Sequence, residues 1–243
     1  DVLNLRSWIQ RRQGDLEGRQ KTLLRGQALD PKDPSWRRLL VRDFYLMHRF
    51  AEAMLHAEPV PPGTDYDIDL IRTLLGAEKS GDTARLLNQL ERLGDVHESY
   101  YWPFDLWYYR ALVGDPRHLE ALELVKAAYP PTDDGLSQFE IAQLQSFWLL
   151  GMKDELHAAL QRATTKMDAT RDQNGNYPDS VVLTGALLAA LHGDASAADQ
   201  QVKRWRQVWK DDATEFMFAT DTACIVYAIA SLKEQTRNCI LDG

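Results

Sequence analysis

The sequence has few cysteines and no long apolar run. Cys224 and Cys239 are its two cysteines, and they stand near the C-terminal end of the 243 residues. Two cysteines are too few for a disulfide framework, so the sequence predicts a reducing, cytoplasmic compartment, with Cys224 packed as a thiol on an apolar helix. No stretch approaches the roughly 18 consecutive apolar residues that cross a bilayer, so no membrane partner is expected.

The motifs of common enzyme classes are also missing. There is no glycine-rich phosphate loop, no Gly-x-Ser-x-Gly elbow, and no pair of histidines around a glutamate as in zinc proteases. The segment 172–179 opens like a calcium loop, but it lacks the glycine and the closing glutamate of that motif and is interpreted as a turn. We therefore expect no enzyme activity, no cofactor and no metal site.

The net charge of −8 is unevenly distributed. Residues 1–56 carry 11 basic and 7 acidic side chains, whereas residues 57–243 carry 17 basic and 29 acidic ones. An acidic body disfavours nucleic acid, because neutralising phosphates requires a cationic stripe. It favours a protein partner with a basic surface, although a merely solvated acidic surface is an equally simple interpretation.

Short turns built on glycine divide the chain at regular intervals. Gly81, Gly114, Gly151 and Gly193 each follow an apolar helical run and have an acidic residue within three positions, at intervals of 33, 37 and 42 residues. Such intervals are typical of two short helices and their turns, so they predict an all-α fold of stacked αα-hairpins. The marker residues of tetratricopeptide repeats do not recur at fixed positions, which indicates a degenerate repeat, either TPR-like or a compact α-solenoid.

The expected helices fall into an N-terminal part and a repeat body. The N-terminal part, residues 1–56, contains a helix over 2–25, broken at Gly14 or Gly18, and a second helix that starts at Pro34 and runs to Met54. A proline-rich linker follows over 57–65. The body, 66–243, is expected to contain the helix pairs 66–80 with 82–93, 102–113 with 116–128, 137–150 with 153–168 and 180–191 with 195–210, and a closing helix over 213–234.

Two features suggest a docking surface. One is an acidic run just after the linker, and the other is the segment 100–109, which contains seven of the 23 aromatic residues. Part of the aromatic segment is expected in the core, but aromatic side chains with polar tips often anchor protein interfaces. The candidate partner-binding residues are Asp65, Asp67, Asp69, Asp95, Glu98, Tyr100, Tyr101, Trp102 and Tyr109. Helix capping is the alternative role of the aspartates.

The sequence Trp107-Tyr-Tyr-Arg-Ala-Leu-Val-Gly-Asp115, with the turns at 77–82 and 191–194, resembles the all-helical immunity proteins of bacterial polymorphic-toxin systems, in particular the immunity protein 49 family. The resemblance covers about residues 66–200. It implies a cognate toxin that is neutralised by tight binding, without catalysis by this chain. The alternative is a helical-repeat adaptor or regulator that binds a peptide.

Overall fold

The computed structural model describes residues 2–97, 99, 101–132 and 135–242, apart from the side chains of 213–219, 221 and 240–242. The elements in this part of the chain are helices. They are α1 (Val2–Arg12), α2 (Leu16–Leu29), α3 (Pro34–Leu46), α4 (Phe50–Ala57), α5 (Tyr66–Ser80), α6 (Thr83–Val96), α7 (Trp102–Leu112), α8 (His118–Ala128), α9 (Gln138–Leu149), α10 (Lys153–Asp168), the 3₁₀ turn η1 (Asp179–Val181), α11 (Val182–Leu191), α12 (Ala195–Trp209), α13 (Ala213–Ile229) and α14 (Lys233–Asp242).

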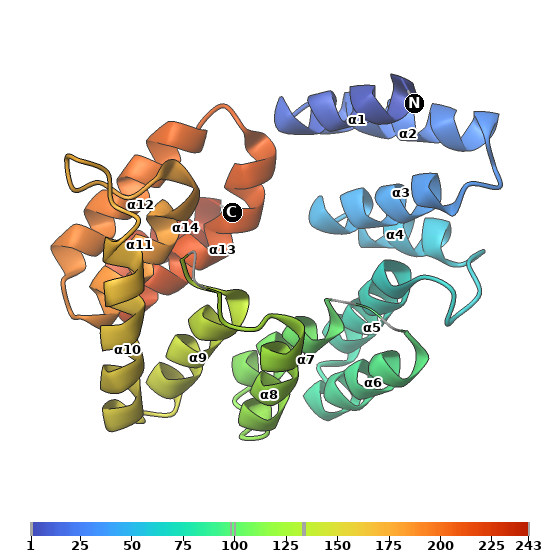
Figure 1. The fold of residues 1–243 in the computed structure, drawn as a ribbon. Helices are drawn as coiled ribbons and strands as arrows, with labels where there is room; N and C mark the ends of the chain where they lie inside the picture. Colours follow the sequence, from blue (N-terminus) through green and yellow to red (C-terminus); the bar gives the residue numbers. More distant parts are fainter. Residues whose placement is uncertain (1, 98, 100, 133–134, 243) are drawn as a thin grey trace. The chain divides into compact units, whose positions relative to one another are not determined.

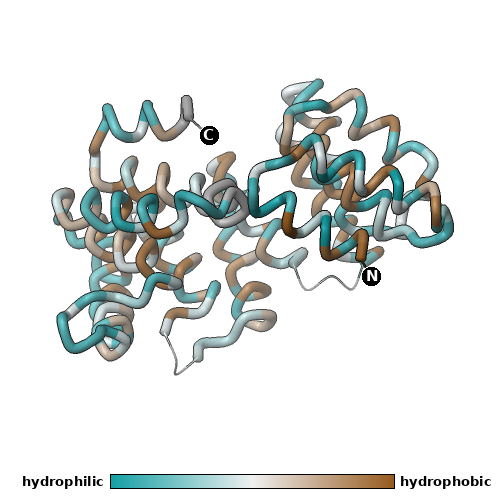
Figure 2. Tube along the Cα trace, turned by 90° about the horizontal axis from the view of Figure 1, so that it is seen from above, coloured by the Kyte–Doolittle hydropathy of each residue, from teal (hydrophilic) through white to brown (hydrophobic). Residues whose placement is uncertain are grey.

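These helices follow one another as hairpins, as the sequence predicts (Figure 1). Helix α1 packs on α2, α3 on α4, α5 on α6, α9 on α10, α11 on α12 and α13 on α14. The chain forms two compact units, residues 1–121 and 122–243. Along the helices, apolar residues alternate with polar ones (Figure 2), so each helix has one side to bury against its neighbours.

Each unit contains a core built by successive hairpins. In the first unit, Leu23, Trp36, Leu40, Ala53 and Ile68 join α2, α3, α4 and α5, and each is at most 4% exposed. In the second unit, the core includes Leu160, Leu187, Val202, Trp205 and Val226, which come from α10, α11, α12 and α13. A single hairpin could not bury these side chains, so stacking stabilises the fold.

The glycine turns have the geometry that the sequence predicts. Gly114, Gly151 and Gly193 have φ angles of 72°, 65° and 81°, in the left-handed region that glycine adopts without strain. In each turn the next amide donates to the carbonyl five residues back, as in Asp194 N to Ala189 O at 2.9 Å. Gly81 is also left-handed, with φ 67°, but its own amide donates to Ala77 O.

Two further hairpins use the same turn without glycine, and here the predicted helices were too long. The expected helix to Met54 is divided between α3 and α4, and the expected closing helix is divided between α13 and α14. His48 and Ser231 occupy the left-handed positions, with φ 56° and 57°. The amides of Arg49 and Leu232 then donate to carbonyls five residues back. The first 57 residues therefore contain four helices: the break near Gly14 was expected, and the break at His48 was not.

The cysteines differ from the prediction. Cys224 of α13 and Cys239 of α14 form a disulfide across the last hairpin, with Cα atoms 5.5 Å apart. Cys224 is therefore not a packed free thiol. The sequence could not show this pairing, because it depends on the turn at Ser231 that brings α14 back along α13.

The segment 57–65, expected as a linker, is held by Arg72 of α5. Its Nη2 donates to Ala57 O and Val60 O, both at 2.5 Å. Ala57 belongs to α4 and is fully buried. This segment therefore connects α4 to α5 inside the first unit.

Candidate functional site

The candidate surface belongs to the first unit, at the start of α5 and along α7. Of the nine predicted residues, Glu98 and Tyr100 lie outside the described residues. The exposed ones are Asp95, near the end of α6, and Tyr101, the residue before α7, which is 64% exposed. Asp65, Asp67 and Tyr109 are partly exposed. Asp69 and Trp102 have structural roles, described next.

The three aspartates of the acidic run have different environments. Asp65 caps α5 by accepting from the Ile68 amide at 3.2 Å. Asp67, with a side chain 38% exposed, lies 3.9 Å from the Arg38 guanidinium. Arg38 also lies 3.8 Å from Asp65, so one cation of α3 partly neutralises this acidic end of α5. Asp67 is therefore the member of the run that remains available to a partner.

Asp69 is buried, at 7% exposure, which corrects its prediction as a surface contact. Its carboxylate accepts from Gly63 N at 2.6 Å and from Arg72 Nη1 at 2.7 Å. The Nε2 atom of His97 lies 3.0 Å away. These partners balance the charge of the buried carboxylate and tie the α4–α5 connection to the end of α6.

Trp102 is also occupied within the unit. Its indole Nε1 donates to Leu90 O of α6 at 2.7 Å. The ring packs so closely on Gly94 that a Cβ atom there would lie 2.2 Å from it. Trp102 therefore positions α7 on α6, and because it is still partly exposed, its role as an interface anchor stays a prediction.

Tyr66 and Asp105 form the least expected contact near the site. The Tyr66 hydroxyl donates to Asp105 Oδ2 at 2.6 Å, which joins α5 to α7. Burial raises the pKa of Asp105 to about 6, the nearby Asp67 charge also raises it, and the hydrogen bond from Tyr66 opposes the rise. Burial and the Asp105 carboxylate raise the pKa of Tyr66. Sequence reasoning missed the pair because its members are 39 residues apart.

Further tyrosines on α3 and α7 extend this cluster. Tyr45 of α3 has its pKa raised by burial, by the charge of Glu78 on α5 and by Tyr108 on α7. Tyr109 likewise raises the pKa of Tyr66. The rings of Tyr108 and Tyr109 meet edge to face, with centroids 5.2 Å apart. We call these four tyrosines with Asp67, Glu78 and Asp105 the tyrosine–acid face.

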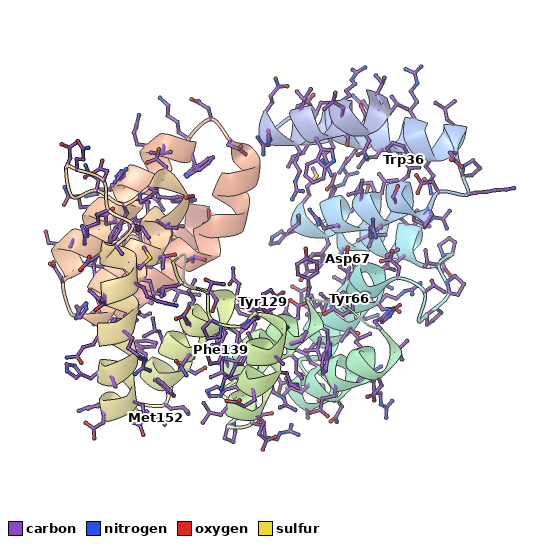
Figure 3. The ribbon with its side chains drawn as sticks, viewed as in Figure 1. Trp36, Tyr66, Asp67, Tyr129, Phe139 and Met152 are labelled. Atoms are coloured by element: carbon purple, nitrogen blue, oxygen red, sulfur yellow. A yellow bond between two sulfur atoms is a disulfide. The ribbon has the colours of Figure 1, made fainter. Side chains whose placement is uncertain are left out.

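The tyrosine–acid face lies on the first helices of three consecutive hairpins. Tyr66 and Asp67, which open α5, lie at the N-terminal end of that helix (Figure 3). Aromatic rings and carboxylates together suit a cationic group, because the ring faces and the carboxylates both attract positive charge. In the part of the chain described, no three histidine, cysteine, aspartate or glutamate side chains are grouped to hold a metal ion. Among the same residues, no helix is long and apolar enough to cross a membrane.

Comparison with solved structures defines the class of the fold. The chain is similar to a tetratricopeptide repeat protein from Parabacteroides merdae, known from a crystal structure, with a TM-score of 0.53 and 14% sequence identity. The match covers 98% of each chain. No protein-family model matches this chain. No curated protein sequence matches it either. The chain thus has an all-α, TPR-like helical-repeat fold.

Proposed function

We propose that this chain is a non-catalytic protein-binding module and that its partner docks on the tyrosine–acid face. The observation that carries the proposal is the gathering of Tyr66, Asp67, Asp105 and Tyr109 on the first helices of neighbouring hairpins. Helical repeats use such successive helices as extended binding surfaces. Tyr101, exposed next to α7, extends the aromatic part of this surface.

The partner of this face has a basic surface. Residues 57–243 carry 12 more acidic than basic side chains, which attracts a cationic protein over long range. Arg38 neutralises part of the acidic run, whereas Glu78 has no ion pair among the described residues. Partner lysines or arginines would meet such carboxylates, and the tyrosine rings would contact their aliphatic stems.

In its specific form, the module is an immunity protein that neutralises a cognate bacterial toxin by occluding the toxin's active site or binding groove. The support is the resemblance of residues 66–200 to the immunity protein 49 family. The fold agrees with this role but is equally suited to the second candidate, an adaptor that binds a peptide of a regulatory partner.

Co-expression with a basic toxin encoded next to this chain distinguishes the two candidates. The immunity role requires that the wild-type chain protects cells and co-purifies with the toxin. Asp67→Lys and Tyr101→Ala should weaken both effects. Asp154→Lys introduces the same charge change at an exposed position on α10 of the second unit and should leave them intact.

The outcomes separate the claims. Binding without protection favours the adaptor. Full protection by Asp67→Lys and Tyr101→Ala would refute the proposed face but retain the immunity role. Hydrolysis of a test substrate by the purified chain, with an activity that co-elutes with the chain in every chromatographic step, would contradict the proposal that the chain is not a catalyst.

A further inference from the structure

We propose a second docking surface, along α6, that binds an extended acidic peptide segment. It is separate in residues and in charge from the tyrosine–acid face. It consists of a shallow groove beside α6 whose exposed cations are Arg85 and Arg92.

The groove is formed by two adjoining hollows. The first, of about 500 Å³, is lined by Asp82, Ala84, Arg85, Asn88, Gln89 and Arg92. The second, of about 280 Å³, shares Gln89 and Arg92 with the first and continues to Leu93 and Val96. Its other wall comes from Pro62, Gly63 and the α5 residues 69, 72 and 73. At about 1.5 Å of helix rise per residue, the groove follows α6 for roughly 20 Å.

The side chains of Arg85 and Arg92 are exposed and form no hydrogen bond or ion pair with the described residues. Each carboxylate that lines the groove has a partner within the chain. Asp82 accepts from the Arg85 backbone amide at 2.9 Å as the cap of α6, and Asp69 is buried against Arg72 and His97. The guanidinium groups of Arg85 and Arg92 are therefore available to an external anion, whereas Arg72 is held by Asp69.

The spacing of the two arginines indicates the form of the ligand. Seven residues along a helix correspond to a rise of about 10.5 Å. An extended chain advances by about 3.3 Å per residue, so carboxylates three positions apart on a bound strand would meet both guanidinium groups. Each guanidinium can bind a carboxylate through two parallel N–H donors.

The rest of the groove fits the same ligand. Asn88 and Gln89 lie between the arginines in sequence, and their amides can pair with a peptide backbone. At the far end, Pro62, Leu93 and Val96 line the smaller hollow, and Val96 is 58% exposed. An apolar side chain just after the second acidic residue would cover this apolar end.

The test uses the full-length chain and a labelled peptide, acetyl-Gly-Glu-Gly-Gly-Glu-Leu-Gly-amide, with fluorescence anisotropy as the measurement. The analogue in which both glutamates are glutamine is the ligand control. We expect the Glu peptide to bind more tightly than the Gln peptide, and the difference to shrink with added salt. Replacing both arginines (Arg85→Gln with Arg92→Gln) should weaken binding about tenfold, about threefold for each exposed pair.

Lys79→Gln is the matched protein control, because Lys79 is an exposed cation at the end of α5 that does not line the groove. It should bind the Glu peptide like the wild-type chain. Equal affinity for the Glu and Gln peptides, no effect of the double arginine variant, or no binding up to about 1 mM would each overturn the proposal. None of these results would affect toxin binding at the tyrosine–acid face.

Discussion

The Tyr66 hydroxyl donates a 2.6 Å hydrogen bond to the Asp105 carboxylate and thereby connects the first residue of α5 to the first turn of α7. Asp105 has no cationic partner in the described part of the chain, so a half-buried negative charge depends on one hydroxyl. This arrangement has a consequence for stability that can be measured.

Asp105 should make the free energy of unfolding fall as pH rises. Its pKa is about 6 in the folded chain, above the ordinary value of 3.8, so the folded state holds the proton more tightly than the unfolded state does. Stability from this group is present below the unfolded pKa and is lost between about pH 4 and 6. A shift of about two units corresponds to at most about 3 kcal/mol.

Urea unfolding of the wild-type chain and of Asp105→Asn at pH 4.5 and 7 measures the contribution of Asp105 to the free energy of unfolding. The asparagine keeps an acceptor for Tyr66 but does not titrate, so the variant should gain more stability relative to wild type at pH 7 than at pH 4.5. Other groups titrate in both proteins, and their contributions cancel in the difference between the two unfolding free energies. A constant difference across pH would contradict the assignment.

Tyr66→Phe should destabilise the chain more at pH 7 than at pH 4.5. Removing the hydroxyl leaves the ionised Asp105 without its hydrogen bond, at a cost of about 1–3 kcal/mol, and raises the Asp105 pKa further. Protonation at low pH relieves most of that cost. The same urea series provides the readout, and equal losses at both pH values would show that the bond does not stabilise the ionised form.

Two substitutions at the left-handed position of the hairpin turns should change stability in opposite directions. Gly193→Ala should cost about 1 kcal/mol, because φ is 81° and an added Cβ would meet no atom within 4 Å, so only backbone strain changes. Ser231→Gly should stabilise by a similar amount, since serine is in the left-handed region there at φ 57°. Thermal unfolding of both variants checks the signs, and a stabilising Gly193→Ala would contradict the turn geometry.

The Cys224–Cys239 disulfide closes a loop of 15 residues and should stabilise the last hairpin by about 3 kcal/mol. A thiol assay on the unreduced, denatured chain should find no free thiol, and reduction should lower the melting temperature. The double variant Cys224→Ser with Cys239→Ser should not respond to reductant. The cytoplasmic location remains a prediction, and a stable disulfide argues against it. Two free thiols in chain purified from a reducing cytoplasm would favour that location.

Much of the fold followed from local sequence chemistry, because glycine and a following aspartate terminate and restart helices within a few residues. Gly114-Asp115 and Gly193-Asp194 are examples, and in each the aspartate accepts from an amide in the next turn. The turns at His48 and Ser231 were missed because a non-glycine residue in the left-handed region leaves no signal in composition.

The site was less predictable, since it depends on which helices meet. Asp65, Asp67 and Asp69 alternate in sequence, yet one caps, one remains accessible and one is buried, because the helix turns each successive carboxylate to another side. The pairing of Tyr66 with Asp105 required the packing of separate hairpins. Local patterns do not encode that packing.

Hydrogen exchange of the chain with and without its purified partner tests the docking face most directly. The account predicts that added protection concentrates at the start of α5, in the residues around Tyr101 and along α7, with α10 and α12 unchanged. Protection confined to the second unit, with none on α5 and α7, would contradict it.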